Sequence, residues 1–239
     1  MSDISKSPER IAGMFDAIAG RYDFLNHFLS AGIDRRWRRL AIRSLKLSGT
    51  ERVLDLCSGT ADLAIAACRA QPAAKRVVGV DFAEAMLRVG KEKVERERLS
   101  RAIALIRGDA TRIPIASRAV DVVTIAFGIR NIENTAAAFA EIHRVLAPGG
   151  RVAILEFATP PAPAVRAAYR WYSRHVLPRV GRILSHHSEA YGYLPASIEA
   201  FASPDQLVKL LQQSGFTSVS ASPLTFGVVY LYLGSKSRV

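Results

Sequence analysis

The sequence predicts an α/β fold in which a mostly parallel sheet is covered by helices on both faces. Apolar and amphipathic segments alternate, so we expect strands at about 52–57, 76–81, 102–107, 120–126 and 150–157 and helices at about 60–70, 83–99 and 133–146. Strands that are apolar on both faces and separated by helices are typical of parallel sheets. The segment Val53-Leu54-Asp55-Leu56-Cys57-Ser58-Gly59-Thr60, followed 21 residues later by Asp81, indicates a strand, a tight turn onto a helix, and a second strand ending in a carboxylate.

The first 50 residues are expected to form helices that precede the sheet. Between residues 8 and 47, apolar side chains recur at spacings of three and four, which marks one apolar helix face: Ile11, Phe15, Ile18, Tyr22, Leu25 and Leu29. Because Gly20, Gly32 and Gly49 interrupt this segment, we expect several short helices rather than one long helix.

After the fifth strand, residues 160–202 are predicted to form a helical insertion, with helices around Pro178 and a turn at 191–195. A helix at about 204–213 precedes strands near 217–222 and 225–233, which Ser222-Pro223 joins as an antiparallel hairpin at the sheet edge. This layout resembles the class I S-adenosylmethionine-dependent methyltransferases, whose Rossmann-like seven-stranded sheet has an antiparallel last strand. The resemblance implies a single methyltransferase domain at 1–239, with 1–50 as an N-terminal helical cap and 160–202 as part of the substrate site.

Composition excludes several other classes of protein. The 239 residues are 49% hydrophobic and 23% charged, which excludes a disordered or collagen-like chain. The two cysteines, Cys57 and Cys68, lack the spacing of a zinc site or a disulfide framework, and no other cluster predicts a metal. The N-terminus lacks the apolar core of a signal peptide, and no apolar run approaches the roughly 18 residues of a membrane span. We therefore expect a cytoplasmic protein.

The net charge of +12 is concentrated in two segments. One is the run 34–39, and the other interleaves aromatic with basic residues: Arg166, Tyr169, Arg170, Trp171, Tyr172, Arg174, Arg179 and Arg182. Such segments are suited to nucleic acid or to an anionic membrane surface. A solvated helical face is an equally good interpretation, so charge alone leaves the partner open.

The glycine pattern of the first turn separates two classes of adenosine cofactor. A dinucleotide site has G-x-G-x-x-G, in which bare backbone and a helix N-terminus face a pyrophosphate. This chain has only Gly59, with Ser58, Thr60 and Ala61 around it. The pattern favours a nucleoside without phosphates, such as S-adenosylmethionine, over a dinucleotide, although an ordinary strand-turn-helix would look similar.

Polar residues follow four successive predicted strands, where an open α/β sheet binds its ligand. Asp55 and Thr60 flank the first strand end, Asp81 lies at the second, Asp109-Ala110 at the third and 127–131 at the fourth. Asp81 could instead cap the helix that follows it, and Asp109 could be a turn residue. The segment Phe127-Gly128-Ile129-Arg130-Asn131 is unusually polar for the mouth of a buried strand.

Four blocks resemble the UbiE/MenG family, the C-methyltransferases of menaquinone and ubiquinone biosynthesis. Two of them, 54–62 and 144–157, occur broadly among methyltransferases. The other two are narrow: Met14-Phe15-Asp16-Ala17-Ile18-Ala19-Gly20-Arg21-Tyr22-Asp23-Phe24-Leu25-Asn26 with its continuation over 32–38, and Ala126-Phe127-Gly128-Ile129-Arg130-Asn131-Ile132. Two positions depart from the family, which usually has glycine at Ala61 and commonly serine at Ala126.

The resemblance implies a set of site residues. S-adenosylmethionine is expected at Asp55, Gly59, Thr60, Asp81, Asp109 and Ala110. Catalysis is expected at Arg130, Asn131 and Tyr22, next to a polyprenylated quinol such as demethylmenaquinol or the 2-methoxy-6-polyprenyl-1,4-benzoquinol of ubiquinone synthesis. Because the prenyl tail resides in a bilayer, we expect peripheral contact with the anionic inner face of the membrane and no nucleic acid. A homodimer is left open.

Two rival functions are carried forward from the sequence. The basic pI of about 10.2 suits a nucleic-acid methyltransferase, although neither an Asn-Pro-Pro-Tyr motif nor an added binding domain is present. A non-catalytic S-adenosylmethionine-binding scaffold of a quinone-synthesis complex is the other, and the departures at Ala61 and Ala126 are its only support. His143 is a tempting base, but its predicted place inside a helix favours a structural role.

Overall fold

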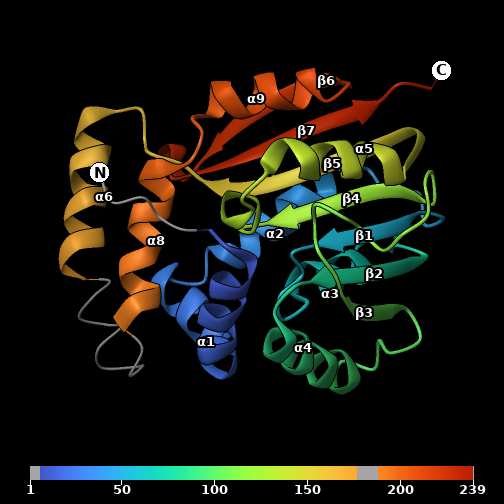
Figure 1. Ribbon diagram of the computed structural model, residues 1–239, viewed down its shortest axis with the longest axis horizontal. Coiled ribbons are helices and arrows are strands. Elements are labelled where there is room, and N and C mark those ends of the chain that lie inside the picture. Colours follow the sequence, from blue (N-terminus) through green and yellow to red (C-terminus); the bar gives the residue numbers. More distant parts are fainter. Residues whose placement is uncertain (1–5, 177–187, 239) are drawn as a thin grey trace.

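A seven-stranded sheet in the order β3-β2-β1-β4-β5-β7-β6 forms the centre of the computed structural model, which describes residues 6–176 and 188–238 (Figure 1). The strands are β1 Arg52–Leu56, β2 Arg76–Asp81, β3 Ile103–Arg107, β4 Val120–Ala126, β5 Leu146–Phe157, β6 Phe216–Leu224 and β7 Val229–Lys236. The first five pair in parallel, while β7 runs antiparallel to both β5 and β6. The predicted fold class is confirmed, including the antiparallel last strand.

Helices cover both faces of the sheet and one of its ends. Their bounds are α1 Pro8–Leu29, α2 Asp34–Ser44, α3 Asp62–Cys68, α4 Glu84–Arg96, α5 Thr135–Val145, α6 Pro163–His175, α8 Ser188–Ala200 and α9 Pro204–Gln213, with short 3-10 helices η1 Ile129–Asn131 and η2 Thr225–Gly227. Helices α1, α6 and α8 lie together at the end to which the arrows of β1 and β4 point (Figure 1). Among the described residues, none of the helices combines the length and apolar character that a bilayer span requires.

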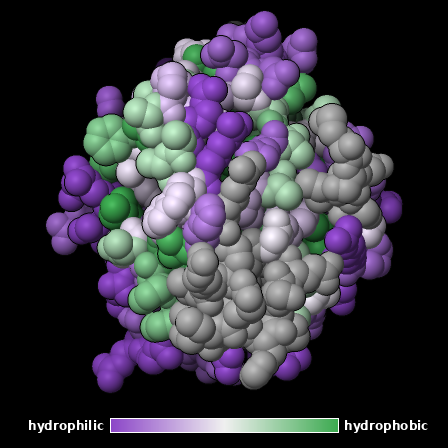
Figure 2. Space-filling model, turned by 90° about the vertical axis from the view of Figure 1, so that its left-hand side faces the viewer, coloured by the Kyte–Doolittle hydropathy of each residue, from purple (hydrophilic) through white to green (hydrophobic). Residues whose placement is uncertain are grey.

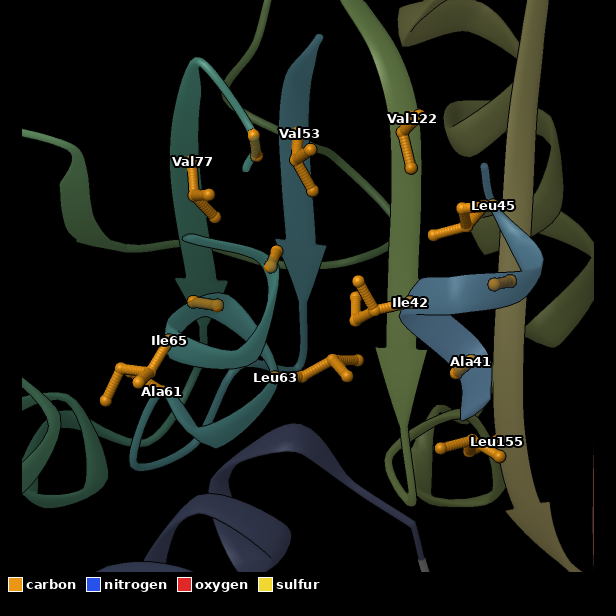
Figure 3. Close-up of a cluster of buried hydrophobic side chains, with 14 of the residues drawn as sticks. Ala41, Ile42, Leu45, Val53, Ala61, Leu63, Ile65, Val77, Val122 and Leu155 are labelled. Atoms are coloured by element: carbon orange, nitrogen blue, oxygen red, sulfur yellow. The ribbon is translucent and has the colours of Figure 1, made fainter. Parts of the chain in front are cut away.

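Two apolar layers hold the helices on the sheet. On one face, side chains of α2 and α3 pack against the strands (Figure 3), through Ala41, Ile42, Leu45, Leu63, Ile65, Val53, Val77, Val122 and Leu155. On the other face, α5 and α9 contribute Phe139, Ile142, Leu207 and Leu211, which pack with Leu54, Leu56, Ile125 and Ile154. Burial of apolar surface on both sides explains why these strands are apolar throughout.

The N-terminal segment forms two helices instead of several short ones. Helix α1 continues unbroken through Gly20, where an added Cβ would meet nothing within 4 Å. The break falls at Gly32, whose φ of +74° turns the chain from α1 into α2. A glycine on an exposed helix surface costs only about 1 kcal/mol, which packing of α1 against α4 offsets. The two helices then diverge, since α2 joins the layer on the sheet whereas α1 lies beyond the strand ends.

Two expectations for the C-terminal third were wrong. Residues 191–195 are helical, inside α8, because buried Ser197 and Ile198 anchor that helix although it contains Pro195. The hairpin connection is η2, since Ser222 and Pro223 pair with β7 inside β6. A proline is tolerated there because β6 is an edge strand. The predicted helices around Pro178 fall partly on 177–187, outside the described residues.

Candidate functional site

A cavity of about 490 Å³ lies where β1 to β4 end. Predicted cofactor residues Gly59, Asp81, Asp109 and Ala110 line it, together with Asn131 from the loop after β4. Helix α1 contributes the opposing wall through Ile11, Ala12, Phe15 and Tyr22. The strand order reverses between β1 and β4, so the cavity occupies the switch point at which open α/β sheets bind ligands.

The loop after β1 is held in left-handed backbone conformations. Cys57, Gly59 and Ala61 have φ of +56°, +51° and +67°, and the last value suits the glycine that the family usually has at this position. The Ala61 methyl group is fully buried in the apolar layer beneath α3 and does not line the cavity. Ala126, the other departure, does line the cavity.

Asp81 is fixed by two backbone amides at the edge of the cavity. Its Oδ2 accepts a hydrogen bond of 2.8 Å from the Gly59 amide, and its Oδ1 accepts one of 2.9 Å from Ala83. Burial raises the pKa of this carboxyl, and the two amides partly oppose that rise. Ala83, not Asp81, occupies the N-cap position of α4. Asp81 therefore joins the loop after β1 to the end of β2, with lone pairs left for a ribose diol.

Asp109 combines the predicted ligand position with the turn role considered for it. Its Oδ1 accepts hydrogen bonds from the Thr111 amide (2.7 Å) and the Thr111 hydroxyl (2.9 Å), so it stabilises the turn after β3. Both Asp109 and Ala110 line the cavity. Such a carboxylate and a backbone amide can recognise the donor and acceptor edge of an adenine.

Asp55 and Thr60 are placed differently from the other predicted cofactor residues. Asp55 is 1% exposed, and its oxygens accept hydrogen bonds from Thr124 Oγ1 (2.8 Å) and the Ala64 amide (3.1 Å). Burial raises the pKa of Asp55 to about 7. Thr60 donates to Asp23 on α1. Neither residue lines the cavity, so the structure shows them supporting its frame, and direct contact with the cofactor stays a prediction.

A buried polar network fastens α1 to this frame. Lys93 on α4 forms ion pairs with Asp23 of α1 and Asp62 of α3, and Asp23 also accepts from Thr60. Arg38 of α2 pairs with Asp62 at 3.5 Å. The four charged members of this network are partly or mostly shielded from water, so loss of one of them would leave a neighbouring charge uncompensated. The network therefore couples the position of α1 to the loop after β1.

The same network accounts for a group of possible metal ligands. Atoms of His27, Asp34 and Asp62 lie within 4.8 Å of one another. Both carboxylates are already neutralised, Asp34 by Arg38 and Asp62 by Lys93 and Arg38. A divalent cation here would be repelled by the two resident cations, so the cluster is better explained as ion pairing.

A second cavity, of about 280 Å³, adjoins the first. Phe15, Tyr22 and Phe127 line both, so a single layer of aromatic side chains separates the two spaces. The remaining walls of the second cavity come from α1, α2, α6, α8 and η2 and are largely apolar or aromatic: Ile18, Leu29, Ile33, Trp37, Phe157, Tyr169, Tyr172, Tyr193, Leu194 and Val228. The predicted insertion thus supplies part of its wall, from α6 and α8.

The three predicted catalytic residues lie at the border of the two cavities. Tyr22 lines both, Asn131 the first and Arg130 the second. Tyr193 donates a hydrogen bond of 3.0 Å to Asn131 Oδ1. Burial raises the pKa of Tyr22, which keeps its hydroxyl protonated at neutral pH. The structure brings these residues together although 108 positions separate Tyr22 from Arg130.

Arg130 is one half of a buried ion pair that the sequence did not reveal. Its Nη1 lies 2.7 Å from Glu156 Oε1 and donates to the Phe127 carbonyl (2.6 Å), while its Nε donates to Ser197 (3.3 Å). Within the described part of the chain, Nη2 has no hydrogen-bond partner. Burial alone would lower the pKa of Arg130, but Glu156 and Tyr22 outweigh it and the net shift is upward. The guanidinium stays charged, with one N–H edge available.

The loops after β1 and β4 approach so closely that only glycine fits at position 128. A Cβ there would lie 2.3 Å from the Cβ of Cys57. Phe127, immediately before it, has φ of +60°. This close approach brings the Arg130-Asn131 segment beside the loop that carries Gly59, and it explains the glycine in the narrow family block.

The first cavity suits a cationic nucleoside better than a nucleotide. Asp81 and Asp109 place two carboxylates on its wall, and Lys6 also lines it. Burial raises the pKa of the Cys57 thiol well above its usual range, and the nearby carboxylates add to that rise. A sulfonium is stabilised beside carboxylates, whereas a pyrophosphate is repelled by them. The carboxylates and the volume together fit S-adenosylmethionine.

A sheet of this order, with such a cavity at its switch point, defines a class I S-adenosylmethionine-dependent methyltransferase. The model of the ubiE/COQ5 methyltransferase family matches residues 3–236, and the chain belongs to this family. The family resemblance predicted from four sequence blocks is therefore confirmed.

Named relatives align with nearly the whole chain. It is 42% identical over 236 residues to a demethylmenaquinone methyltransferase of Bacteroides fragilis, which covers 98% of this chain and 96% of that protein. It is 46% identical over 224 residues to a ubiquinone/menaquinone biosynthesis C-methyltransferase UbiE of Syntrophotalea carbinolica, covering 94% and 93% of the two chains.

Solved structures share the fold at much lower identity. A SAM-dependent methyltransferase from Thermotoga maritima, described as a possible histamine N-methyltransferase, is 17% identical with a TM-score of 0.65, covering 94% of this chain and 99% of that one. The [4+2]-cyclase SpnF is 14% identical with a TM-score of 0.73, and 98% of each chain is covered. Because one of these neighbours is a cyclase by name, the fold alone does not define the reaction.

Substitution of Gly128 by alanine is expected to destabilise the protein by about 1–3 kcal/mol, because the new Cβ would overlap Cys57 and force two loops apart. Urea unfolding measures the change. Gly20→Ala is the matched control, since its Cβ has open space in a helix and should stabilise by about 1 kcal/mol. Equal effects of the two substitutions would contradict the close approach.

Asp55 predicts a specific pH dependence of stability. Its pKa rises from 3.8 to about 7 on folding, so between these values the folded state binds more protons than the unfolded state, and the contribution of Asp55 to stability falls as pH rises. Asp55→Asn does not titrate. The free energy of unfolding of the wild type, measured with urea, should therefore exceed that of the variant by more at pH 5 than at pH 8. A difference independent of pH would show that Asp55 titrates normally.

Proposed function

We propose that the protein transfers a methyl group from S-adenosylmethionine to a ring carbon of a polyprenylated quinol. Demethylmenaquinol is the first candidate acceptor, and the 2-methoxy-6-polyprenyl-1,4-benzoquinol of ubiquinone synthesis is the second. The names of the relatives above support this acceptor class. The observation that carries the proposal is the pair of adjoining cavities: the first presents the carboxylates of Asp81 and Asp109 and suits the donor, and the second is largely apolar and aromatic.

The chemistry needs a nucleophilic ring carbon. When bound, S-adenosylmethionine supplies an electrophilic methyl group, so the protein mainly has to align the acceptor and exclude water. Ionisation of a ring hydroxyl, whose proton passes to water, would move electron density to the neighbouring carbon. That carbon would form the new C–C bond as the bond between the methyl group and the donor sulfur breaks and leaves a neutral thioether. The ring would then lose the proton from that carbon to water, regain aromaticity, and take up a proton on the phenolate oxygen. Alignment and exclusion of water supply up to roughly 7–11 kcal/mol in well-oriented systems.

Arg130 stabilises the phenolate in this scheme. Its free Nη2 edge faces the charge that develops on the ring oxygen, while Glu156, Phe127 and Ser197 hold the rest of the guanidinium. An arginine at neutral pH is too basic to remove a proton itself, so it contributes electrostatics and orients a water that takes the ring proton. Asn131 and Tyr22 fix the ring hydroxyls from the other side of the border.

We further propose that the enzyme is cytoplasmic and peripherally associated with the inner face of the membrane. A prenyl tail is far more soluble in a bilayer than in water, so the acceptor is delivered at the lipid surface. Nucleic acid is not a proposed partner, because most of the wall of the second cavity is apolar or aromatic, which suits a prenylated ring better than a polynucleotide. A homodimer is compatible with the same chemistry.

The direct test uses the purified protein and measures transfer of the labelled methyl group of S-adenosylmethionine to each quinol. The quinols are presented in detergent. We expect labelled product with demethylmenaquinol, and comparison with the benzoquinol defines the acceptor range. Label appearing in tRNA instead would establish the nucleic-acid alternative. Cofactor binding without transfer to either quinol would favour the scaffold.

The role of Arg130 is tested without leaving a buried charge unpaired. Arg130→Met alone would strand Glu156 at a cost of about 3–5 kcal/mol, so the double variant Arg130→Met/Glu156→Met is used, in which both charges are removed together. We expect kcat to fall about 100-fold or more while the cofactor Kd, from titration calorimetry, changes by less than about threefold. A comparable loss of both quantities would contradict a role confined to the acceptor.

A further inference from the structure

Several large apolar side chains of the described residues are exposed on segments that also line the second cavity. These are Phe24, Phe28, Ile33, Trp171 and Phe226. They lie on α1, the α1–α2 turn, α6 and η2, and each of these segments also contributes a wall residue to the second cavity: Leu29, Ile33, Tyr172 and Thr225. On the face that α6 forms at the left of Figure 1, patches of apolar residues lie among hydrophilic ones (Figure 2). Grouped exposed apolar residues mark an interaction surface, whereas single ones do not.

The aromatic members of this group have highly exposed side chains. Phe24 and Phe28 stand one helical turn apart on α1 with stacked rings 5.9 Å apart, and each is more than half exposed. Phe226 is 79% exposed and has φ of +57°, a conformation that a bulky residue rarely adopts. Its neighbour Thr225 accepts a hydrogen bond of 2.9 Å from Trp37 Nε1. That bond holds η2 at the rim of the cavity.

Tyr172 links α6 to this rim. Its hydroxyl donates to the Leu29 carbonyl at the end of α1 (3.0 Å), which holds α6 against the end of α1. Leu29, Ile33 and Tyr172 line the second cavity, and each lies on, or next in the chain to, a segment that carries an exposed aromatic residue.

Positive charge flanks the aromatic residues. Arg35, Arg36 and Arg39 follow Ile33 within the first two turns of α2, and all three are exposed. Within residues 6–176 and 188–238, none of them takes part in an ion pair. Arg179 and Arg182, also noted in the sequence, lie outside that part. Aromatic side chains beside unpaired cations are the composition of surfaces that bind anionic bilayers.

We propose that Phe24, Phe28, Trp171 and Phe226, with Arg35, Arg36 and Arg39, form the surface on which the protein docks to an anionic lipid bilayer. The aromatic rings insert among the acyl chains near the headgroups, and the arginines contact lipid phosphates. The segments that carry these aromatic residues also wall the second cavity, so a docked protein takes the prenyl tail from the lipid to the aromatic wall. This assignment rests on the proposed function, since it is the quinol that gives the cavity an apolar ligand.

The test compares binding with catalysis in the full-length protein. The variants are Phe24→Ser/Phe28→Ser and Phe226→Ser, whose side chains do not line either cavity, and Arg35→Gln/Arg36→Gln/Arg39→Gln. Binding is measured by co-sedimentation with phosphatidylcholine vesicles that contain phosphatidylglycerol. We expect the paired phenylalanine variant to lose about tenfold or more in vesicle affinity. The arginine variant should lose the salt-sensitive part of binding. Lys75→Gln/Arg76→Gln, exposed at the opposite end of the sheet, is the control and should bind as wild type.

Activity assays with two substrates separate the role of the docking surface from that of the candidate active site. With a water-soluble demethylated naphthoquinol that has no prenyl tail, the phenylalanine variant should keep the wild-type kcat/KM. With the prenylated quinol in vesicles, its kcat/KM should fall about tenfold or more, in step with binding. Unchanged vesicle binding in the phenylalanine and arginine variants overturns the assignment. The assignment is also overturned if the wild type binds tRNA and not vesicles, and the arginine variant loses that tRNA binding. Sedimentation requires no turnover, so failure of the wild type to methylate either quinol is a separate result that counts against the proposed function.

Discussion

The site depends on the point in the sheet where the chain leaves two neighbouring strands, β1 and β4, toward opposite faces. β1 and β4 pair in parallel, but α3 leaves toward one face and α5 toward the other. The crevice between them would close or widen if their loops were not held at a fixed distance. Gly128, pressed against Cys57, sets that distance. Left-handed backbone at Cys57 and Phe127 on either side of the contact shows that local strain is concentrated where the ligand is expected.

Helix α1 covers the crevice, and an ion pair between Asp23 and Lys93 fixes the helix in that position. Asp23 reaches Thr60 and Lys93 across helix boundaries, so the loop that faces the donor and the helix that covers it move as one unit. The same helix presents Phe15 and Tyr22 to both cavities. The second cavity of this scaffold is thus formed largely by segments that precede β1 or are inserted between β5 and β6. A cyclase shares the scaffold, so the fold does not define what such a cavity holds.

The sequence alone predicted the sheet, its helices and most of the donor cavity. Parallel strand ends meet at one edge, so Asp81 and Asp109 could be placed from spacing alone. Asp55 could not, because side chains alternate along a strand: Leu54 and Leu56 pack toward α5 and α9, which turns Asp55 to the face under α3. Glu156 was missed for another reason. It is 26 residues from Arg130, and only the pairing of β4 with β5 brings the two charges together.

The second cavity was the least predictable part of the candidate site. Its walls come from α1, α2, α6, α8 and η2, and no periodicity indicates that Leu29, Tyr172 and Thr225 will meet. The turn expected at 191–195 shows the same limit, since a local proline signal was overridden by the burial of Ser197 and Ile198.

The shared aromatic wall has a thermodynamic consequence. Phe15, Tyr22 and Phe127 cannot shift to accommodate one occupant without reshaping the space of the other. By linkage, if a ligand in the first cavity changes the affinity of the second cavity for its ligand by some factor, the second ligand changes the affinity of the first cavity by the same factor. The binding of two ligands is thereby coupled through three aromatic rings before any bond forms between them.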